Sequence, residues 1–342
     1  MSKWRMKRKN WLDKHSRLLN KKKKIWTYNN NRITTFNPAI VRIKKNNPPF
    51  IKLELPQRFS LMDNPEETMK FFMCFAREIE QKEFGKYFYI DSSKVEYVTV
   101  DALIYLIAIL QNKTFNRAMR YSFRGNYPLN EDARRVYKES GFNDYVKLNM
   151  KDLPRSTDKM RIVSGNRNKS ETSRDVCDFV IKKLGKTKQQ IQPLQKVLIE
   201  LMSNVFYHAY ENTFMTKKWY MYAEHVDNHV KCVFVDTGQG IAKTVRKNFR
   251  ERLRTFVGID NNDAKLIQSA FNGEFRTSTK EKHRGNGLLS VRANAGNDLF
   301  KRFEVLSGRG HCVLLKNVSE NNMVITNYNN TLYGTLYMFV VE

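Results

Sequence analysis

The sequence predicts a mixed α/β protein built from two folded units. Between residues 49 and 150, short apolar strands alternate with amphipathic helices, which is typical of βα units. From residue 187 to 342, a long amphipathic helix precedes strands that end in glycine-rich turns. The first pattern predicts an α/β layer. The second predicts an α/β sandwich of the α+β kind, in which a mixed sheet carries helices on one face.

Length and composition support this division. The chain has 342 residues, enough for two domains that each bury a core, and its hydrophobic fraction of 41% is compatible with globular folding. Residues 151–186 are rich in Ser, Asn and charged side chains and are expected to connect the two units. Residues 1–48 are dominated by positive charge and predict a basic, partly disordered arm.

The charge balance leaves two interpretations open. Lys and Arg number 61 against 34 Asp and Glu, a formal net charge of +27, which predicts attraction to polyanions. In the arm, Trp4, Trp11 and Trp26 lie among the basic residues and could stack on bases of a nucleic acid. The alternative is a solvated arm that packs a few aromatic side chains onto its own protein.

The four cysteines and the apolar runs indicate a cytoplasmic protein. The cysteines are far apart, form no Cys-x-x-Cys pair and are expected to be reduced. No apolar stretch follows the basic start, so no secretory signal is expected. The longest apolar run, Val98 to Leu110, contains Asp101 and is too short to span a bilayer, so no membrane association is expected.

A helix over residues 193–208 places two polar side chains on one edge. Leu194, Leu198 and Leu201 recur at helical spacing and predict a buried stripe. Glu200 and Asn204 flank that stripe one turn apart. A carboxylate and an amide held there could polarise an O–H group and offer an oxygen to Mg²⁺. The alternative is a helix edge that is merely polar.

Three further motifs follow in order. The buried strand Lys231 to Val235 runs directly into Asp236-Thr-Gly238-Gln-Gly240, which aims a carboxylate off a strand end. Arg284-Gly285-Asn-Gly287-Leu precedes an apolar helical run, so its glycines predict a helix N-terminus able to receive phosphate. Gly334-Thr335 opens the final strand.

Taken together, these four motifs resemble the GHKL ATP-binding family over residues 187 to 342. The resemblance implies that Glu200 is a general base, that Asn204 coordinates Mg²⁺, and that Asp236 accepts the adenine amino group with Thr335 nearby. It also implies roles for five other residues in shaping the adenine pocket or meeting the phosphates of ATP. They are Gly238, Gly240, Lys280, Gly285 and Gly287.

The basic segment from Ala242 to Arg284 matches the position of the lid that closes over nucleotide in that family. Arg276, Lys280 and Arg284 are the candidates to meet the β- and γ-phosphates, and a solvated basic loop is the alternative. The resemblance implies a regulatory ATPase that uses Mg-ATP to drive a conformational switch. An anti-sigma-type protein serine/threonine kinase and a non-catalytic nucleotide-gated binding module stay open. The protein partner and the oligomeric state also stay open.

Residues 49 to 150 look like the STAS fold of anti-sigma antagonists. The strand, turn and apolar helix from Tyr87 to Leu110 carry this resemblance, with Ser140-Gly-Phe142 ending a later helix. At the position of the STAS phosphoacceptor hydroxyl this chain has Asp101, which could imitate a charged, phosphorylated state. Ser92 and Ser93 are expected to form a turn.

Overall fold

The computed structural model describes most of the chain from residue 50 onward. The described residues are 35–36, 50–80, 87–112, 122–146, 156–168, 170–207, 217–248, 262–275, 287–315 and 323–342. The predicted basic arm therefore lies outside them, apart from a two-residue strand. The mixed α/β class expected from the sequence is confirmed.

The first unit is built on a parallel sheet with strand order β1-β6-β4-β2. Phe88 on β4 and Phe123 on β6 are buried and pack on Phe75 of helix α2. A two-stranded sheet, β3-β5, lies beside it. The elements of this unit are β1 (Thr35–Phe36), β2 (Phe50–Glu54), β3 (Arg58–Phe59), α2 (Pro65–Glu80), β4 (Tyr87–Asp91), β5 (Tyr97–Val98), α3 (Val100–Gln111), β6 (Ser122–Gly125), α4 (Glu131–Glu139) and the 3₁₀ helix η2 (Phe142–Asp144).

The second unit is a five-stranded sheet with strand order β10-β11-β9-β8-β7. Every neighbouring pair runs antiparallel, so the expected mixed sheet is wrong. The consecutive strands β8 and β9 pair with each other, as do β10 and β11, whereas helices α5 and α6 separate β7 from β8 in the chain, and β11 lies beside β9. The elements are β7 (Lys159–Gly165), α5 (Ser170–Leu184), α6 (Lys188–Tyr207), β8 (Trp219–Val226), β9 (His229–Asp236), α7 (Ile241–Asn248), α9 (Asp263–Phe271), α10 (Gly287–Ala295), β10 (Phe300–Leu315) and β11 (Val324–Val341).

Strands β8 and β9 form a hairpin with a two-residue turn. Its turn residues Asp227 and Asn228 both have positive φ, 46° and 63°, as a tight two-residue hairpin turn requires. This turn sets the register that brings Trp219 opposite Asp236 at the far end of the hairpin.

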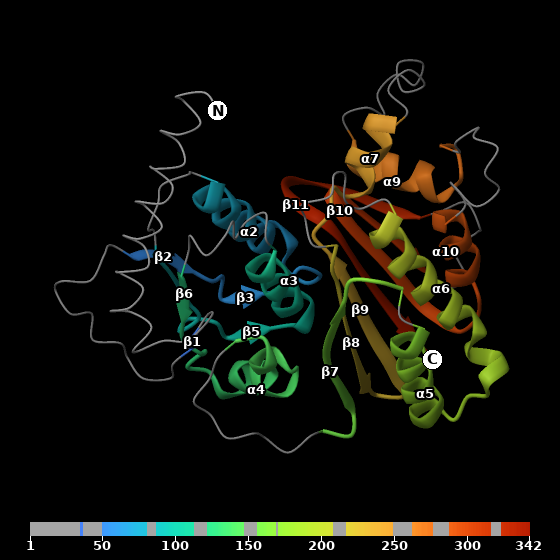
Figure 1. Cartoon of the computed structure of the whole chain (residues 1–342), viewed down its shortest axis with the longest axis horizontal. Helices are drawn as coiled ribbons and strands as arrows, with labels where there is room; N and C mark the ends of the chain where they lie inside the picture. Colours follow the sequence, from blue (N-terminus) through green and yellow to red (C-terminus); the bar gives the residue numbers. More distant parts are fainter. Residues whose placement is uncertain are drawn as a thin grey trace, which may run out of the picture.

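One face of the five-stranded sheet is covered by helices of its own unit. Phe234, Phe303 and Phe339 point into a core shared with the buried stripe of α6, including Leu194, Leu198 and Leu201. Helices α5, α6 and α10 lie along this face in Figure 1, and α7 and α9 lie toward one end of the sheet. The predicted amphipathic stripe therefore has its expected partner, the sheet.

The opposite face of the same sheet packs on helix α3 of the first unit. All residues from Val100 to Leu110 are buried, because α3 lies between the core of its own unit and the second sheet (Figure 1). Tyr222 and Val235, on the second sheet, belong to the same hydrophobic cluster as the first unit. Helices thus cover both faces of this sheet, whereas the sequence indicated one.

The expected connector, 151–186, contributes to the second unit. Strand β7 pairs with β8 at the sheet edge, and α5 packs in the helical layer. The four side chains of β7 from Met160 to Val163 are mostly half-buried and show no clean alternation, which is why the strand pattern is weak in the sequence.

Candidate functional site

Glu200 and Asn204 lie on the edge of α6 that faces the start of α10. Both side chains are half-buried. A methyl group added at Gly287 would lie 2.9 Å from Asn204 Oδ1 and 3.2 Å from Glu200 Oε2. The absence of a side chain at Gly287 therefore lets the first turn of α10 approach both polar groups.

The polar atoms at this point are only partly satisfied. The amide nitrogen of Asn204 is buried and has no hydrogen-bond partner among the described residues. Burial raises the pKa of the Glu200 carboxyl above its ordinary value. A carboxylate with a raised pKa beside an unsatisfied amide is an arrangement able to take up a proton and to bind a polar ligand.

Asp236 ends strand β9 and is 4% exposed. Its Oδ1 accepts a hydrogen bond from the Gly238 backbone N–H at 2.7 Å, and Thr335 lies opposite it on β11 and also hydrogen-bonds the carboxyl. Burial raises the pKa of Asp236 to about 7, although the hydrogen bonds from Gly238 and Thr335 act in the opposite direction. The carboxyl is thus a buried, titratable acceptor at the end of the sheet.

Two glycines with positive φ allow the backbone to close around Asp236. Gly240 has φ of 80° and Gly334 has φ of 82°. A methyl group at Gly240 would lie 3.0 Å from the Gly334 carbonyl oxygen, and one at Gly334 would collide with the Asp236 carbonyl. Only glycine fits both positions.

Ser307 hydrogen-bonds both of these glycine turns. It was not among the residues predicted from the sequence. Its buried hydroxyl donates to the Gly334 carbonyl at 2.8 Å and accepts from the Ile241 N–H at 2.9 Å. Ser307 comes just before Gly308, which has φ of 60° at a register shift in β10. A serine next to a glycine in the middle of a strand is the only sequence signal of this role.

A short series of contacts brings the α6 edge and Asp236 to the same end of the sheet. Trp219, paired with Asp236, donates its indole N–H to the Arg167 carbonyl at 2.9 Å. The next residue, Asn168, donates to Ser203 Oγ at 3.1 Å, directly before Asn204. In Figure 1 the C-terminal ends of α6 and β9 accordingly lie toward the end of the sheet where α7 begins.

The described residues thus hold most of the predicted site. Glu200, Asn204 and Gly287 come together as one group, and Asp236, Gly238, Gly240 and Thr335 as another, at one end of the sheet. The remaining candidates, Arg276, Lys280, Arg284 and Gly285, lie outside the described residues. Their segment is joined to α10 at Gly287, the residue that touches the first group.

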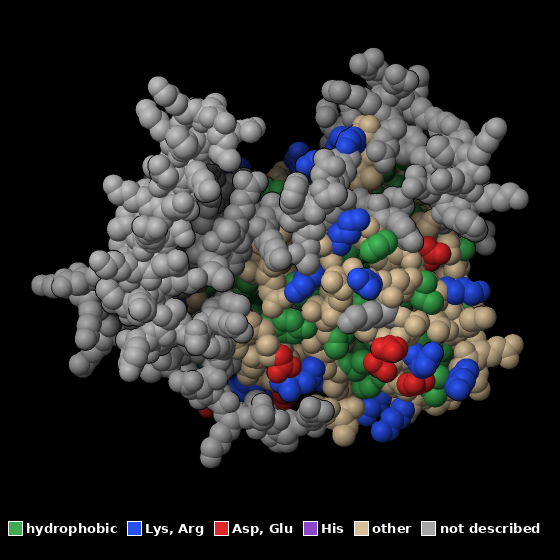
Figure 2. Space-filling model, viewed as in Figure 1, with side chains coloured by type: hydrophobic (Ala, Val, Ile, Leu, Met, Phe, Trp, Pro, Cys, Tyr) green, Lys and Arg blue, Asp and Glu red, His purple; other side chains and the backbone are tan. Residues whose placement is uncertain are grey.

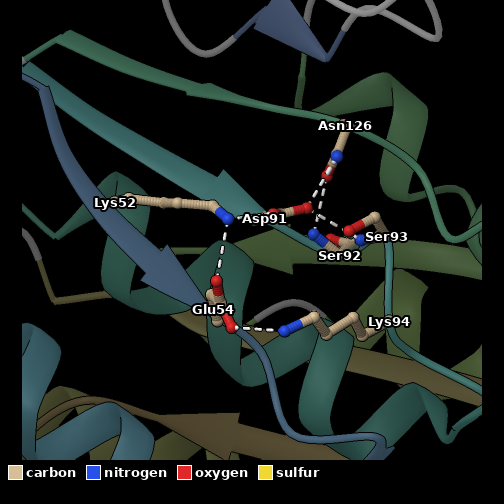
Figure 3. Close-up of polar contacts among 7 residues, drawn as sticks. All are labelled: Lys52, Glu54, Asp91, Ser92, Ser93, Lys94 and Asn126. Atoms are coloured by element: carbon tan, nitrogen blue, oxygen red, sulfur yellow. Dashed lines mark hydrogen bonds and ion pairs between the residues drawn. The ribbon is translucent and has the colours of Figure 1, made fainter.

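A second polar cluster lies at the ends of strands β2, β4 and β6 in the first unit (Figure 3). Asp91 pairs with Lys52 at 2.8 Å and accepts from Asn126 at 2.7 Å and from the Ser93 N–H at 2.9 Å. Burial alone would raise the pKa of Asp91, but these hydrogen bonds hold it well below its usual range. These hydrogen bonds and this ion pair join residues of β2, of β4 and of the segments after β4 and β6 to one another, so the cluster holds the three strands together. Ser93 lies in the expected turn.

Asp101 does not present a charge at the surface of the first unit. Its side chain is fully buried, and its Oδ1 accepts from the Leu61 N–H at 2.8 Å and from Thr99 Oγ1 at 2.7 Å. Burial raises the pKa of the carboxyl, which favours the neutral form. The expectation that Asp101 imitates a charged, phosphorylated state is therefore wrong, because the start of α3 faces the core and burial favours the neutral carboxyl.

Surface charge, the cysteines and helix length bear on the expectations about polyanion binding, thiol state and membrane association. Basic and acidic side chains are interspersed over the described part of the face shown in Figure 2. The four cysteines are free thiols, with Cys177, Cys232 and Cys312 buried. Within the described ranges, each helix is too short or too polar to cross a membrane.

Comparison with known proteins leaves the family of this chain open. A scan against protein-family models finds no matching family. A search of curated proteins finds no significantly similar sequence.

Proposed function

We propose that the second unit binds Mg-ATP in the manner of GHKL ATPases and that the protein is a regulatory ATPase. The observation that carries the proposal is the meeting of Glu200, Asn204 and Gly287 at the same end of the sheet as the buried carboxyl of Asp236. Residues of three motifs from separate parts of the chain are thereby gathered, and Thr335 of the fourth lies opposite Asp236.

In this proposal Asp236 recognises the adenine ring. The carboxyl already accepts hydrogen bonds from the Gly238 N–H and from Thr335, and because a carboxylate has about four acceptor positions, it can also accept the exocyclic amino group. Because the carboxyl is buried, a hydrogen bond to it is worth more than one at the surface. Thr335, on the neighbouring strand, supplies a hydroxyl beside it.

The α6 edge is suited to the phosphate end and to Mg²⁺. The polar end of Asn204 faces the space that a side chain at residue 287 would fill, and its buried amide nitrogen has no partner among the described residues. Asn204 would hold the ion through its side-chain Oδ1, which faces residue 287. Mg²⁺ bound there would offset phosphate charge during hydrolysis.

Glu200 is the proposed general base. Its carboxylate lies beside Gly287, and burial raises its pKa toward the range in which a base works near neutral pH. It would accept a proton from the attacking water. The backbone N–H groups at the start of α10 would meet phosphate oxygens, as helix N-termini do.

Measurement of binding and turnover tests this function. Purified full-length protein should bind a fluorescent ATP analogue saturably in the presence of Mg²⁺, and Asp236→Asn should weaken binding at least tenfold. Glu200→Gln should retain binding and lose hydrolysis. Asp175→Asn and Glu171→Gln, at exposed positions on α5, are the matched controls. Absence of saturable binding by the unaltered protein would overturn the proposal.

The fate of the γ-phosphate separates the two catalytic alternatives. With γ-labelled ATP, release of free phosphate supports an ATPase, whereas label on an added protein partner supports a serine/threonine kinase using the same base. Binding with neither outcome supports a non-catalytic nucleotide-gated module.

A further inference from the structure

Helix α3 of the first unit reaches the two segments that carry Asp236 and Thr335. Tyr105 and Asn112 are seven residues apart, so they lie on the same side of α3. Tyr105 contacts the backbone of Tyr333, and Asn112 contacts Thr237. Each contact thus falls one or two residues from a residue of the proposed adenine site.

Tyr105 hydrogen-bonds the backbone of β11 at a break in the sheet register. The β10–β11 register jumps from Ser307↔Thr335 to Gly308↔Leu332, and the β9–β11 ladder ends at Thr335, so Tyr333 and Gly334 lie outside both ladders. The Tyr105 hydroxyl donates to the Tyr333 carbonyl at 2.8 Å and accepts from the Tyr333 N–H at 3.0 Å. One phenol thereby hydrogen-bonds both backbone groups of Tyr333 at this break in the register.

Asn112 holds the other segment. It caps the C-terminus of α3, is 8% exposed, and donates from its side-chain amide to Thr237 Oγ1 at 2.7 Å. Thr237 is also 8% exposed and lies between Asp236 and Gly238, which are themselves hydrogen-bonded. The contact therefore fixes the turn that orients the carboxyl.

The two segments held by α3 also touch each other. Gly334 packs so closely on the Asp236 carbonyl and on Thr237 that any side chain there would collide with them. A displacement of either segment would therefore move the other, and α3 contacts both.

We propose that Tyr105 and Asn112 are positioning residues for nucleotide binding and that α3 makes the first unit part of the nucleotide site. This inference rests on the proposed function. The two side chains act through Tyr333 and Thr237 on Asp236 and Thr335, so a change in the position of α3 changes nucleotide affinity. The first unit is then the part of the protein that senses or sets the occupancy of the site.

Three single variants of the full chain test the inference. Tyr105→Phe and Asn112→Ala should each weaken binding of a fluorescent ATP analogue and of ADP by roughly five- to tenfold, the range expected for the loss of one or two buried hydrogen bonds. The turnover number at saturating ATP should stay near that of the unaltered protein. Tyr145→Phe is the control, because it removes a tyrosine hydroxyl bond to Ile162 on β7, the edge strand two places from β9.

A double-mutant cycle excludes a merely structural effect. In a Thr237→Val background, Asn112→Ala should cause little further loss of affinity, whereas Thr237→Ser, which keeps the hydroxyl, should restore the sensitivity to Asn112→Ala. Losses that simply add, or equal losses in Tyr145→Phe, would overturn the inference. Full affinity in both variants would also overturn it while leaving ATP binding intact. If the unaltered protein bound no ATP, the proposed function itself would be wrong.

Discussion

Thr335 lies directly opposite Asp236 across the β9–β11 ladder, and its hydroxyl hydrogen-bonds the buried carboxyl. Strand β11 therefore supplies both a neighbour for the carboxyl and, through Gly334, the close backbone contact that shapes its surroundings. The buried carboxyl is the most strongly constrained group of the candidate site, and two predictions concern it.

Asp236→Asn should stabilise the free protein above neutral pH. The folded-state pKa of about 7 lies above the unfolded value of 3.8, so this group's contribution to stability is fully present below pH 3.8 and is lost as pH rises to 7. Because the Asn side chain does not ionise, the free energy of unfolding of the Asp236→Asn variant should exceed that of the unaltered protein by about 2 to 4 kcal/mol at pH 8. Urea unfolding at pH 5 and pH 8 measures it. Equal differences at the two pH values would contradict the buried titration.

ATP affinity should fall as pH decreases through 7. If adenine binds the ionised carboxyl, protonation of the free protein competes with binding, and affinity at pH 6 should be about tenfold weaker than at pH 8. Titrations at saturating Mg²⁺ over this range provide the measurement. Asp236→Asn is the control, since its remaining pH dependence reports the nucleotide phosphates. Parallel curves for the two proteins would count against the role of Asp236.

Gly287→Ala should weaken Mg-ATP binding about tenfold or more with little loss of stability. The new methyl would press on Asn204 Oδ1 and Glu200 Oε2, which are side-chain ends that can move aside, and alanine favours a helix. Gly296→Ala, just beyond α10, is the matched control, because its methyl would meet only ordinary contacts at 3.5 Å and 3.8 Å. Unchanged affinity in Gly287→Ala would show that nucleotide does not use this end of α10.

Ser307→Ala should destabilise the protein by about 1 to 3 kcal/mol. The substitution leaves the Ile241 N–H and the Gly334 carbonyl without their buried partner. Thermal unfolding compared with the exposed-site variant Ser156→Ala gives the measurement. A change in stability no greater than that of the control would mean that water or a shifted backbone replaces the hydroxyl.

Deletion of residues 1–34 tests nucleic-acid binding by the basic arm. This deletion keeps β1, which pairs with β6, so the sheet of the first unit stays complete. If the arm binds phosphates, affinity for single-stranded RNA or DNA and its dependence on salt should both fall. Fluorescence anisotropy at several salt concentrations measures both. If the shortened protein had the same nucleic-acid affinity and the same salt dependence, the positive charge of the arm would serve solubility and not nucleic-acid binding.

Local patterns predicted much of the fold. The stripe of Leu194, Leu198 and Leu201 predicted the buried face of α6, and Asp227 and Asn228 are residue types that favour the positive φ of the β8–β9 hairpin turn. These features depend on neighbouring residues, which is why a single sequence contains them. No local pattern predicts that Glu200, Asn204 and Gly287 lie together. That expectation came from the order of the motifs along the chain and the family that they resemble.

Other features depend on packing between distant segments. The contacts of Asn112 with Thr237 and of Tyr105 with Tyr333 exist only because α3 lies on the second sheet. Strand β7 lies at a sheet edge, and its mostly half-buried side chains give no alternating signal. Ser307 acts at a register shift in β10 that the sequence marks only by the following glycine.

The burial of α3 on every side has a practical consequence for work with fragments. A second unit expressed without residues 50–146 would expose Tyr222 and Val235 and the rest of that apolar sheet face to water, and it would be prone to self-association. Truncation for crystallisation should therefore trim only the N-terminal arm. By the same reasoning, this sheet could be grafted onto another protein only together with the helix that covers it.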